Sequence, residues 1–234
     1  MVGPGDDGGG RVSFSADAWS AARPWYDAIR RHPFLTGLAD GSLDRAVFLR
    51  YIVDDAHYLS RFARALATTA ARWPEPVQAA RLARFAAGAV DAERLLHAAL
   101  LADEGMDIDA VDAEPTPTCL AYVNTLQSDA AQAPAGVALA GLLPCFRVYT
   151  EVGRELVTVL DGADGDQHPY AAWLRTYGDP VFAEDTRTAE SFVDDQAERH
   201  PGTVEAMHAA YAQATRFEWM FWDAAWRGET WPKP

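Results

Sequence analysis

The sequence has little positive charge and few cysteines. Its 20 Lys and Arg side chains stand against 34 Asp and Glu, which gives a net charge of −14. Surfaces that bind nucleic acid or anionic membranes need a basic patch, so this balance argues against both kinds of partner and suits a neutral or cationic small ligand. There are two cysteines, Cys119 and Cys145. In a cytosolic chain we expect no structural disulfide, although the sequence leaves a pairing of the two open.

Long apolar runs and secretory features are also absent. No apolar run approaches the roughly 18 residues that a membrane-spanning helix needs. The opening MVGPGDDGGG has neither the basic nor the apolar region of a secretory signal. We therefore expect a soluble, cytoplasmic protein with a disordered tail over residues 1–15 and a single domain over residues 16–234.

Strand patterns are missing as well, because no alternating pair of segments or hairpin turn stands out. Apolar residues recur at helical spacing instead, which predicts an all-α protein. No repeat or linker divides the chain, so the helices are expected to share one core as a compact bundle. With ends placed to within roughly 2–4 residues, helices are expected over residues 16–31, 42–71, 75–104, 117–131, 135–160, 168–177, 180–199 and 202–226.

Local signals set the starts of two of these helices. Asp40-Gly41-Ser42 predicts a turn that ends in an N-cap at Ser42, with Asp44 as a negative charge in the first helical turn. Pro117 follows Thr116 at a position where a first-turn proline is tolerated.

Three helices carry a chemically active group on an apolar stripe. Asp55 lies on the stripe of 42–71, Cys145 on that of 135–160 and Glu218 on that of 202–226. Burying an unpaired carboxylate costs several kcal/mol unless it is partnered or neutralised. An interior pocket with a polar ligand would account for all three positions.

Each of these residues also has a plainer interpretation. A buried free cysteine is usually a small core residue. The carboxylates of Asp55 and Glu218 have arginines as alternative partners in a buried ion pair, and the candidates are Arg50, Arg61 and Arg216. Periodicity alone therefore leaves the function open.

Longer motifs add to this pattern. The chain contains HPFLTGLADGSL, FLRYIVDDAHYL, LLPCFRVYTEVG, WLRTYGDPVF and RFEWMFWDAAW, in this order over about residues 20–227. Together they resemble the TenA family, thiaminase II, in its cysteine-containing class. The resemblance implies the all-helical haem-oxygenase-like fold and a homotetramer.

The resemblance also implies a reaction and a site. The family converts 4-amino-5-aminomethyl-2-methylpyrimidine to the 5-hydroxymethyl pyrimidine in thiamin salvage, with possible thiaminase II activity, and requires no metal or other cofactor. Cys145 matches its nucleophile, Glu218 its acid/base carboxylate, and Asp55 the residue that holds the pyrimidine amino group. The residues that match the rest of the pocket are Tyr58, Tyr122, Tyr149 and Tyr177, with Phe221 beside the ring.

Two positions depart from the family pattern. The chain has Asp54 where the family often has Gln, and His57 where an aromatic residue is common. The extra carboxylate beside Asp55 either faces solvent or alters the amine side of the substrate.

Other functions stay open. A non-haem di-iron oxygenase of this fold would use Glu-x-x-His pairs, and the chain has one, Glu205 with His208, with only Glu93 and His97 to replace a second. A noncatalytic pyrimidine-binding or regulatory module would keep the pocket without turnover. Haem is suggested by the fold name alone, and His32, at a helix end, is a poor axial ligand.

Overall fold

Helices supply the regular structure of this chain. The computed structural model describes residues 12–102, 114–161 and 165–233, and no strand occurs in these ranges. The all-α prediction is confirmed there, whereas residues 1–11 of the expected tail lie outside the described residues. The helices are α1 (Phe14–Arg30), α2 (Pro33–Asp40), α3 (Arg45–Ala71), α4 (Pro76–Ala102), α5 (Pro117–Gln132), α6 (Ala135–Leu156), α7 (Ala171–Tyr177), α8 (Pro180–Arg199) and α9 (Val204–Arg227), with 3-10 turns η2 (Val157–Asp161), η3 (Gly165–Gln167) and η4 (Pro201–Thr203).

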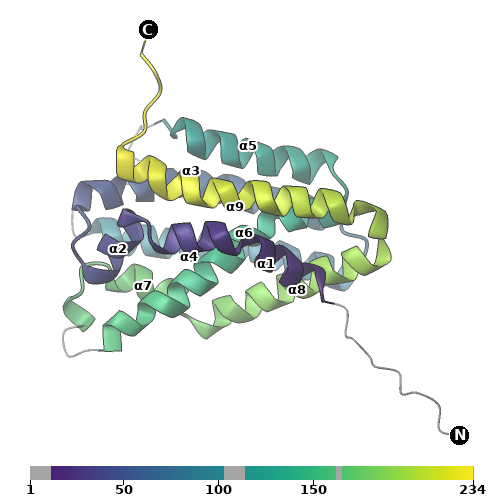
Figure 1. Ribbon diagram of the computed structural model, residues 1–234, viewed down its shortest axis with the longest axis horizontal. Coiled ribbons are helices and arrows are strands. Elements are labelled where there is room, and N and C mark those ends of the chain that lie inside the picture. Colours follow the sequence, from purple (N-terminus) through teal and green to yellow (C-terminus); the bar gives the residue numbers. More distant parts are fainter. Residues whose placement is uncertain (1–11, 103–113, 162–164, 234) are drawn as a thin grey trace, which may run out of the picture.

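The helices pack as one bundle around α6 (Figure 1). α6 contacts α3, α5, α7, α8 and α9, and α9 also contacts α1 and α5. α3 packs along α4. The apolar faces of these helices meet in one buried cluster, so the active groups on α3, α6 and α9 are directed toward a common interior.

The central helix is unusually apolar. The segment Ala135–Asp161, with a mean hydropathy of 1.2, is long and apolar enough to cross a membrane by length and composition. In the bundle, 72% of that window is buried inside the molecule. A helix surrounded by other helices needs apolar side chains on every face. Packing in the core therefore accounts for this composition.

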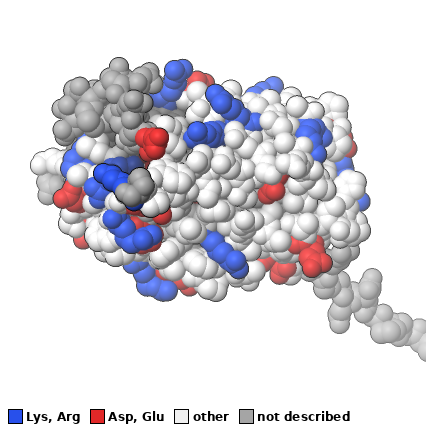
Figure 2. All heavy atoms as spheres, turned by 90° about the horizontal axis from the view of Figure 1, so that it is seen from above, with Lys and Arg blue, Asp and Glu red and all other residues white. Residues whose placement is uncertain are grey.

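Charges of both signs are mixed on the surface. Figure 2 shows acidic and basic side chains interspersed over one face of the molecule. Some of them pair, as Arg199 does with Glu75 at 2.6 Å. Such exposed pairs contribute little to stability.

One short helix, α2, is absent from the sequence-based prediction. It begins after His32, whose Nδ1 atom accepts a hydrogen bond from the Phe34 backbone N–H at 3.1 Å. Pro33 lies in its first turn, and it ends at Gly41 with φ of 76°, in the left-handed region that favours glycine. The other ring nitrogen of His32 lies 3.5 Å from Asp223 Oδ1. His32 is therefore a buried helix cap, which does not fit a haem ligand.

α3 begins within the stated margin of its predicted start, but the predicted N-cap is wrong. Asp44, not Ser42, is the N-cap, because its Oδ1 atom accepts a hydrogen bond from the Ala46 backbone N–H at 2.7 Å. Ser42 belongs to the preceding turn and donates its backbone N–H to Asp40 Oδ1 at 2.9 Å. An ionised carboxylate is a stronger acceptor than a serine hydroxyl, which explains the choice of cap.

Asp54 joins α3 to the start of α5. Its carboxylate accepts hydrogen bonds from the Thr116 backbone N–H at 2.9 Å and from the Thr116 hydroxyl at 2.6 Å. Thr116 in turn caps α5 by accepting from the Cys119 backbone N–H at 3.1 Å. Burial raises the pKa of Asp54, and the bonds from Thr116 oppose that rise. Asp54 thus faces neither solvent nor the substrate: it fixes the helix that carries Tyr122.

We expect Asp54→Ala to lower the free energy of unfolding by about 2–3 kcal/mol, because hydrogen bonds to charged groups are worth about 1.5–3 kcal/mol and Thr116 would lose its acceptor. Urea unfolding followed by circular dichroism measures this change. Glu184→Ala, which removes an exposed carboxylate on α8, is the control and should cost less than about 0.5 kcal/mol. Equal losses in the two variants would contradict the role given to Asp54.

Candidate active site

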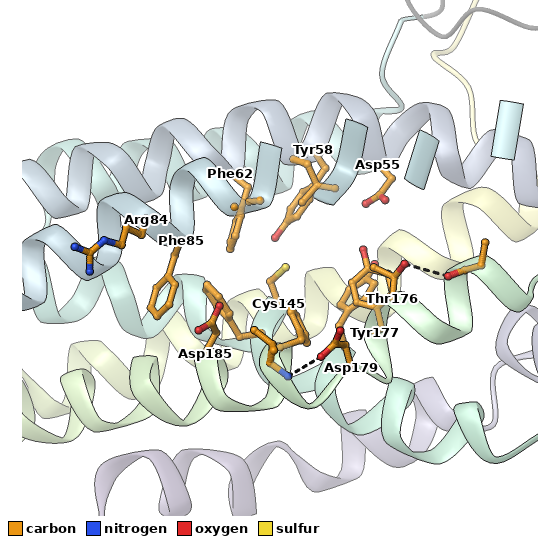
Figure 3. Close-up of a pocket in the computed structure, with 18 residues that line it drawn as sticks. Asp55, Tyr58, Phe62, Arg84, Phe85, Cys145, Thr176, Tyr177, Asp179 and Asp185 are labelled. Carbon is orange, nitrogen blue, oxygen red and sulfur yellow. Dashed lines mark hydrogen bonds between the residues drawn. The ribbon is translucent and has the colours of Figure 1, made fainter. Parts of the chain in front are cut away.

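A pocket of about 490 Å³ opens between α3, α4, α6, α7 and α8 (Figure 3). Most of its wall is apolar or aromatic, with a few polar groups among these side chains. Small-molecule sites typically have volumes of about 300–1,000 Å³ and walls of this kind. The pocket is therefore suited to a small organic ligand.

Five of the predicted site residues line this pocket. They are Asp55 and Tyr58 of α3, Cys145 and Tyr149 of α6, and Tyr177 at the end of α7. Figure 3 shows Asp55 and Tyr58 reaching in from α3 while the Cys145 thiol points toward them from α6. Segments far apart in the sequence thus bring a thiol and a carboxylate to one buried space.

The other three predicted residues, Tyr122, Glu218 and Phe221, lie one side-chain layer behind this wall. The Tyr58 ring centroid is 5.0 Å from that of Tyr122 and 5.5 Å from that of Phe221. The Tyr122 hydroxyl donates a hydrogen bond to Glu218 Oε1 at 2.6 Å. The predicted acid/base carboxylate is therefore next to the thiol pocket but not on its surface.

Glu218 has an unusual protonation equilibrium. Burial raises its pKa from 4.5 to about 7, and the hydrogen bond from Tyr122 lowers it only in part. The titratable side chains around it include Tyr58, Tyr122, Tyr149 and Tyr211, and burial raises the pKa of each above its ordinary value. At neutral pH these tyrosines are uncharged and Glu218 is partly protonated, as a general acid must be.

The structure bears on the plainer interpretations of two of the three active groups. Glu218 bonds to Tyr122, whereas Arg216 is exposed, so this carboxylate is not held in an ion pair with that arginine. Cys145 belongs to the buried apolar cluster and also lines the pocket, so its position is not explained by core packing alone. Cys119 and Cys145 are not joined in a disulfide, so the pairing left open by the sequence is not formed.

A hydrogen-bonded aromatic network supports the inner wall. The hydroxyls of Tyr51 and Tyr149 share a hydrogen bond at 3.2 Å, and the indole N–H of Trp173 donates to the Tyr51 hydroxyl at 3.3 Å. The Tyr177 ring lies 4.7 Å from the rings of both Tyr149 and Trp173. The supporting roles of Tyr51 and Trp173 could not be predicted from the sequence, because helical spacing indicates that a residue is buried but not which residues it contacts.

The residues of α4 and α8 that line the pocket were also not among the predicted site residues. It includes Arg84 and Phe85 of α4, with Phe182 and Asp185 of α8. In the sequence these residues belong to ordinary amphipathic helices, and nothing in their spacing indicates which helix they face.

The candidate metal ligands have other partners or lie apart. His208 Nε2 is 3.5 Å from Asp17 Oδ2, and Glu205 is exposed. The side chains of Glu93 and His97 lie outside the described residues. Among the side chains that are described, no three His, Cys, Asp or Glu groups are grouped so that they could hold a metal ion.

Comparison with known proteins places the chain in a family. The model of the TENA/THI-4/PQQC family matches residues 19–228. This chain belongs to that family. It is 32% identical over 225 residues to the aminopyrimidine aminohydrolase of Bacillus subtilis (strain 168), a match that covers 94% of this chain and 92% of that protein. It is 33% identical to the thiamine biosynthesis multifunctional protein ThiED of Corynebacterium efficiens, over 89% of this chain but only 28% of that longer protein.

Solved structures confirm the fold. A TenA homologue from P. horikoshii OT3 superposes with a TM-score of 0.84 at 26% identity, over 93% of this chain and 100% of that one. A domain from Shewanella denitrificans with a heme oxygenase-like fold superposes with a TM-score of 0.69 at 15% identity, over 93% of this chain and 94% of that one. The family and the haem-oxygenase-like fold predicted from the motifs are thus both confirmed.

The raised pKa of Glu218 makes stability depend on pH. Because its folded pKa of about 7 exceeds its ordinary value of 4.5, the folded protein holds this proton more tightly than the unfolded chain does, and stability falls as pH rises between these values. Glu218→Gln cannot ionise, so it should gain stability relative to wild type by on the order of 3 kcal/mol across this range.

Melting temperatures of wild type and Glu218→Gln between about pH 5 and pH 8 measure this gain, at about 2–4 °C per kcal/mol. A difference in melting temperature that stays constant across the range would show that Glu218 does not titrate there.

Proposed function

We propose that this protein hydrolyses 4-amino-5-aminomethyl-2-methylpyrimidine to the 5-hydroxymethyl pyrimidine, a reaction of thiamin salvage, and that it also has thiaminase II activity. The observation that carries this proposal is the approach of Cys145 and Asp55 to one buried pocket. Family membership and an aminopyrimidine aminohydrolase among the relatives support it.

In the proposed reaction water replaces an amine on the methylene carbon. The Cys145 thiolate adds to an electron-poor ring carbon, so that a C–S bond forms and the ring loses its aromaticity. The ring electrons then break the bond between the methylene carbon and the amine nitrogen, and the amine leaves with a proton. Water adds to the methylene carbon and returns a proton to the protein, and the thiolate departs as the ring becomes aromatic again.

Asp55 orients the ring for this attack. Its carboxylate accepts a hydrogen bond from the exocyclic amino group and so places the ring carbon beside the thiol. Asp55 is 2% exposed, and in such a setting water competes little for this bond. The rings of Tyr58, Tyr149 and Tyr177 supply flat surfaces for the pyrimidine.

Glu218 supplies the proton that activates a ring nitrogen. Its pKa of about 7 suits this task at neutral pH. Between Glu218 and the pocket lie Tyr122, which bonds to it, and Tyr58, whose ring packs on Tyr122. The path of the proton from Glu218 to the ring nitrogen therefore runs along Tyr122 and Tyr58. The Phe221 ring, 5.5 Å from that of Tyr58, helps to hold these side chains in place.

Substituting the two buried cysteines separately tests the nucleophile. Cys145→Ser should lower turnover at least about 100-fold, because an alcohol is a much poorer nucleophile than a thiolate. Cys119→Ser is the matched control: the Cys119 thiol lies outside the pocket and donates to the Asp54 carbonyl oxygen at 3.4 Å, a bond that serine can keep. Formation of the hydroxymethyl pyrimidine, followed by chromatography, gives the rates.

Full activity of Cys145→Ser would reject the assigned nucleophile. Tight pyrimidine binding by wild type without any product would favour the noncatalytic binding module instead.

We also propose that the protein acts as a cytoplasmic homotetramer without metal or other cofactor. Exposed aromatic and apolar side chains on α1 and α9, including Trp25, Met220 and Trp226, support a contact between copies of the chain. Sedimentation velocity measures the assembly. Elemental analysis of the isolated protein separates this reading from the di-iron oxygenase, which would carry iron.

A further inference from the structure

The chain turns back after α9 and returns to the beginning of α5, so that the end of one helix lies beside the start of the other (Figure 1). We call the returning segment, residues 228–231, the strap. Its turn is made at Gly228, whose φ of 64° lies in the left-handed region. The backbone N–H groups of Gly228 and Glu229 donate to the carbonyl oxygens of Ala225 at 3.3 Å and Ala224 at 2.9 Å. These two bonds fix the direction in which the strap leaves α9.

Two hydrogen bonds join the strap to the start of α5. The half-buried Glu229 accepts a hydrogen bond at Oε2 from the Thr118 backbone N–H at 2.9 Å. The indole N–H of Trp231 donates to the Pro115 carbonyl oxygen at 2.9 Å. A carboxylate at the beginning of a helix also interacts favourably with the helix dipole. The strap therefore holds α5 at the end where charge has the largest effect.

The first backbone N–H groups of a helix have no partner within the helix and need one elsewhere. In α5, Pro117 has no N–H, and the N–H of Cys119 donates to the Thr116 hydroxyl. The N–H of Thr118 donates to Glu229. The start of α5 thus takes one of its caps from a residue 111 positions away in the sequence.

Tyr122 follows Thr118 by four residues, which is one turn of α5. Its ring packs against the rings of Tyr58 and Phe217, with a centroid distance of 5.0 Å to each. A closely packed buried ring has little freedom to change its rotamer. The position of the Tyr122 hydroxyl therefore follows the position of the first turns of α5.

The other end of α5 is held separately. The Arg72 guanidinium donates hydrogen bonds to the carbonyl oxygens of Ala130 and Ala133. Loss of the strap would therefore displace the start of α5, where Tyr122 lies, more than the whole helix.

We infer, given the proposed function, that Glu229 and Trp231 are positioning residues for the acid Glu218. By holding the start of α5, they keep the Tyr122 hydroxyl at hydrogen-bond distance from the Glu218 carboxyl. The strap and Glu218 both belong to the α9 end of the chain, so this contact closes a ring from α9 through α5 and back.

Turnover of the aminopyrimidine gives the first test. Glu229→Ala should lower kcat about fivefold or more and leave KM within about twofold, because the side chains proposed to bind the pyrimidine lie on other helices. Glu229→Gln keeps an oxygen that accepts from Thr118, so it should retain at least about half of the wild-type kcat. Trp231→Phe lacks the indole N–H and should lower kcat about two- to threefold.

The pH profile separates positioning from a general loss of structure. The bond from Tyr122 lowers the pKa of Glu218, so weakening it should raise that pKa and the upper pH at which kcat is half-maximal. Glu229→Ala should raise this pH by about half a unit, in the same direction as Tyr122→Phe, and should add nothing to Tyr122→Phe. Neither variant changes the other titratable side chains around Glu218, which include Tyr58, Tyr149 and Tyr211.

Infrared spectroscopy follows the same equilibrium without substrate. The carbonyl band of protonated carboxyl groups is measured against pH for each protein and for its Glu218→Gln counterpart, and their difference isolates Glu218. The midpoint of this difference should be higher in Glu229→Ala than in wild type.

Asp44→Ala is the matched control. Asp44 is an exposed carboxylate that accepts the Ala46 backbone N–H at 2.7 Å, so it caps the second residue of α3 as Glu229 caps the second residue of α5. This variant should keep kcat within about twofold of wild type and leave the infrared midpoint unchanged.

An infrared midpoint that stays at its wild-type value in Glu229→Ala and Trp231→Phe, or that moves equally in Asp44→Ala, would overturn the role of the strap. Trp231→Phe provides the same test if Glu229→Ala does not fold. If wild type forms no hydroxymethyl pyrimidine, the proposed function fails, whereas a shifted infrared midpoint would still show that the strap sets the bond between Tyr122 and Glu218.

Discussion

The buried hydrogen bond between Tyr122 and Glu218 is the contact on which the arrangement of the site depends. It joins α5 to α9 beside the pocket, at 2.6 Å. Because a neutral carboxyl is far less costly to bury than an ion, burial keeps part of the Glu218 population protonated near pH 7. The packing that closes the core thereby also sets the protonation of this carboxyl, which the proposed mechanism uses as its proton donor.

Two adjacent carboxylates on α3, those of Asp54 and Asp55, lie in different surroundings. Successive residues of a helix point about 100° apart, so neighbours face different surroundings. Asp55 faces the pocket, whereas Asp54 holds Thr116 at the start of α5. Asp54 on α3 is thus connected through α5 to Glu218 on α9. The residue that departs from the family pattern has a structural task one helix away from the chemistry.

The polar members of the candidate site could be proposed from the sequence because each interrupts an apolar stripe. Asp55 and Glu218 stand out in this way, and the longer motifs then suggested their roles. Phe85 and Phe182 do not stand out, because a buried ring that lines a pocket has the same helical spacing as one that fills the core.

Which side chains reach the pocket surface, and which lie behind it, likewise depends on the tertiary packing of the helices. Tyr58 and Tyr122 both lie on apolar stripes, yet only Tyr58 reaches the pocket surface. Which of the two does so depends on how α3, α5 and α9 cross. The short helix α2 was not predicted for a local reason. Its N-cap is His32, and histidine is not among the usual N-cap residues.

The close contact of α6 with the end of α7 bears on where Tyr177 lies in the pocket wall. A Cβ atom at Gly153 would lie 2.1 Å from the Tyr177 carbonyl oxygen, so the two helices touch backbone to backbone. At Gly178, an added Cβ would meet Val157 at 2.7 Å. Close packing therefore sets the distance between α6 and the end of α7, and the place of Tyr177 in the pocket wall depends on the absence of a side chain at Gly153 and Gly178.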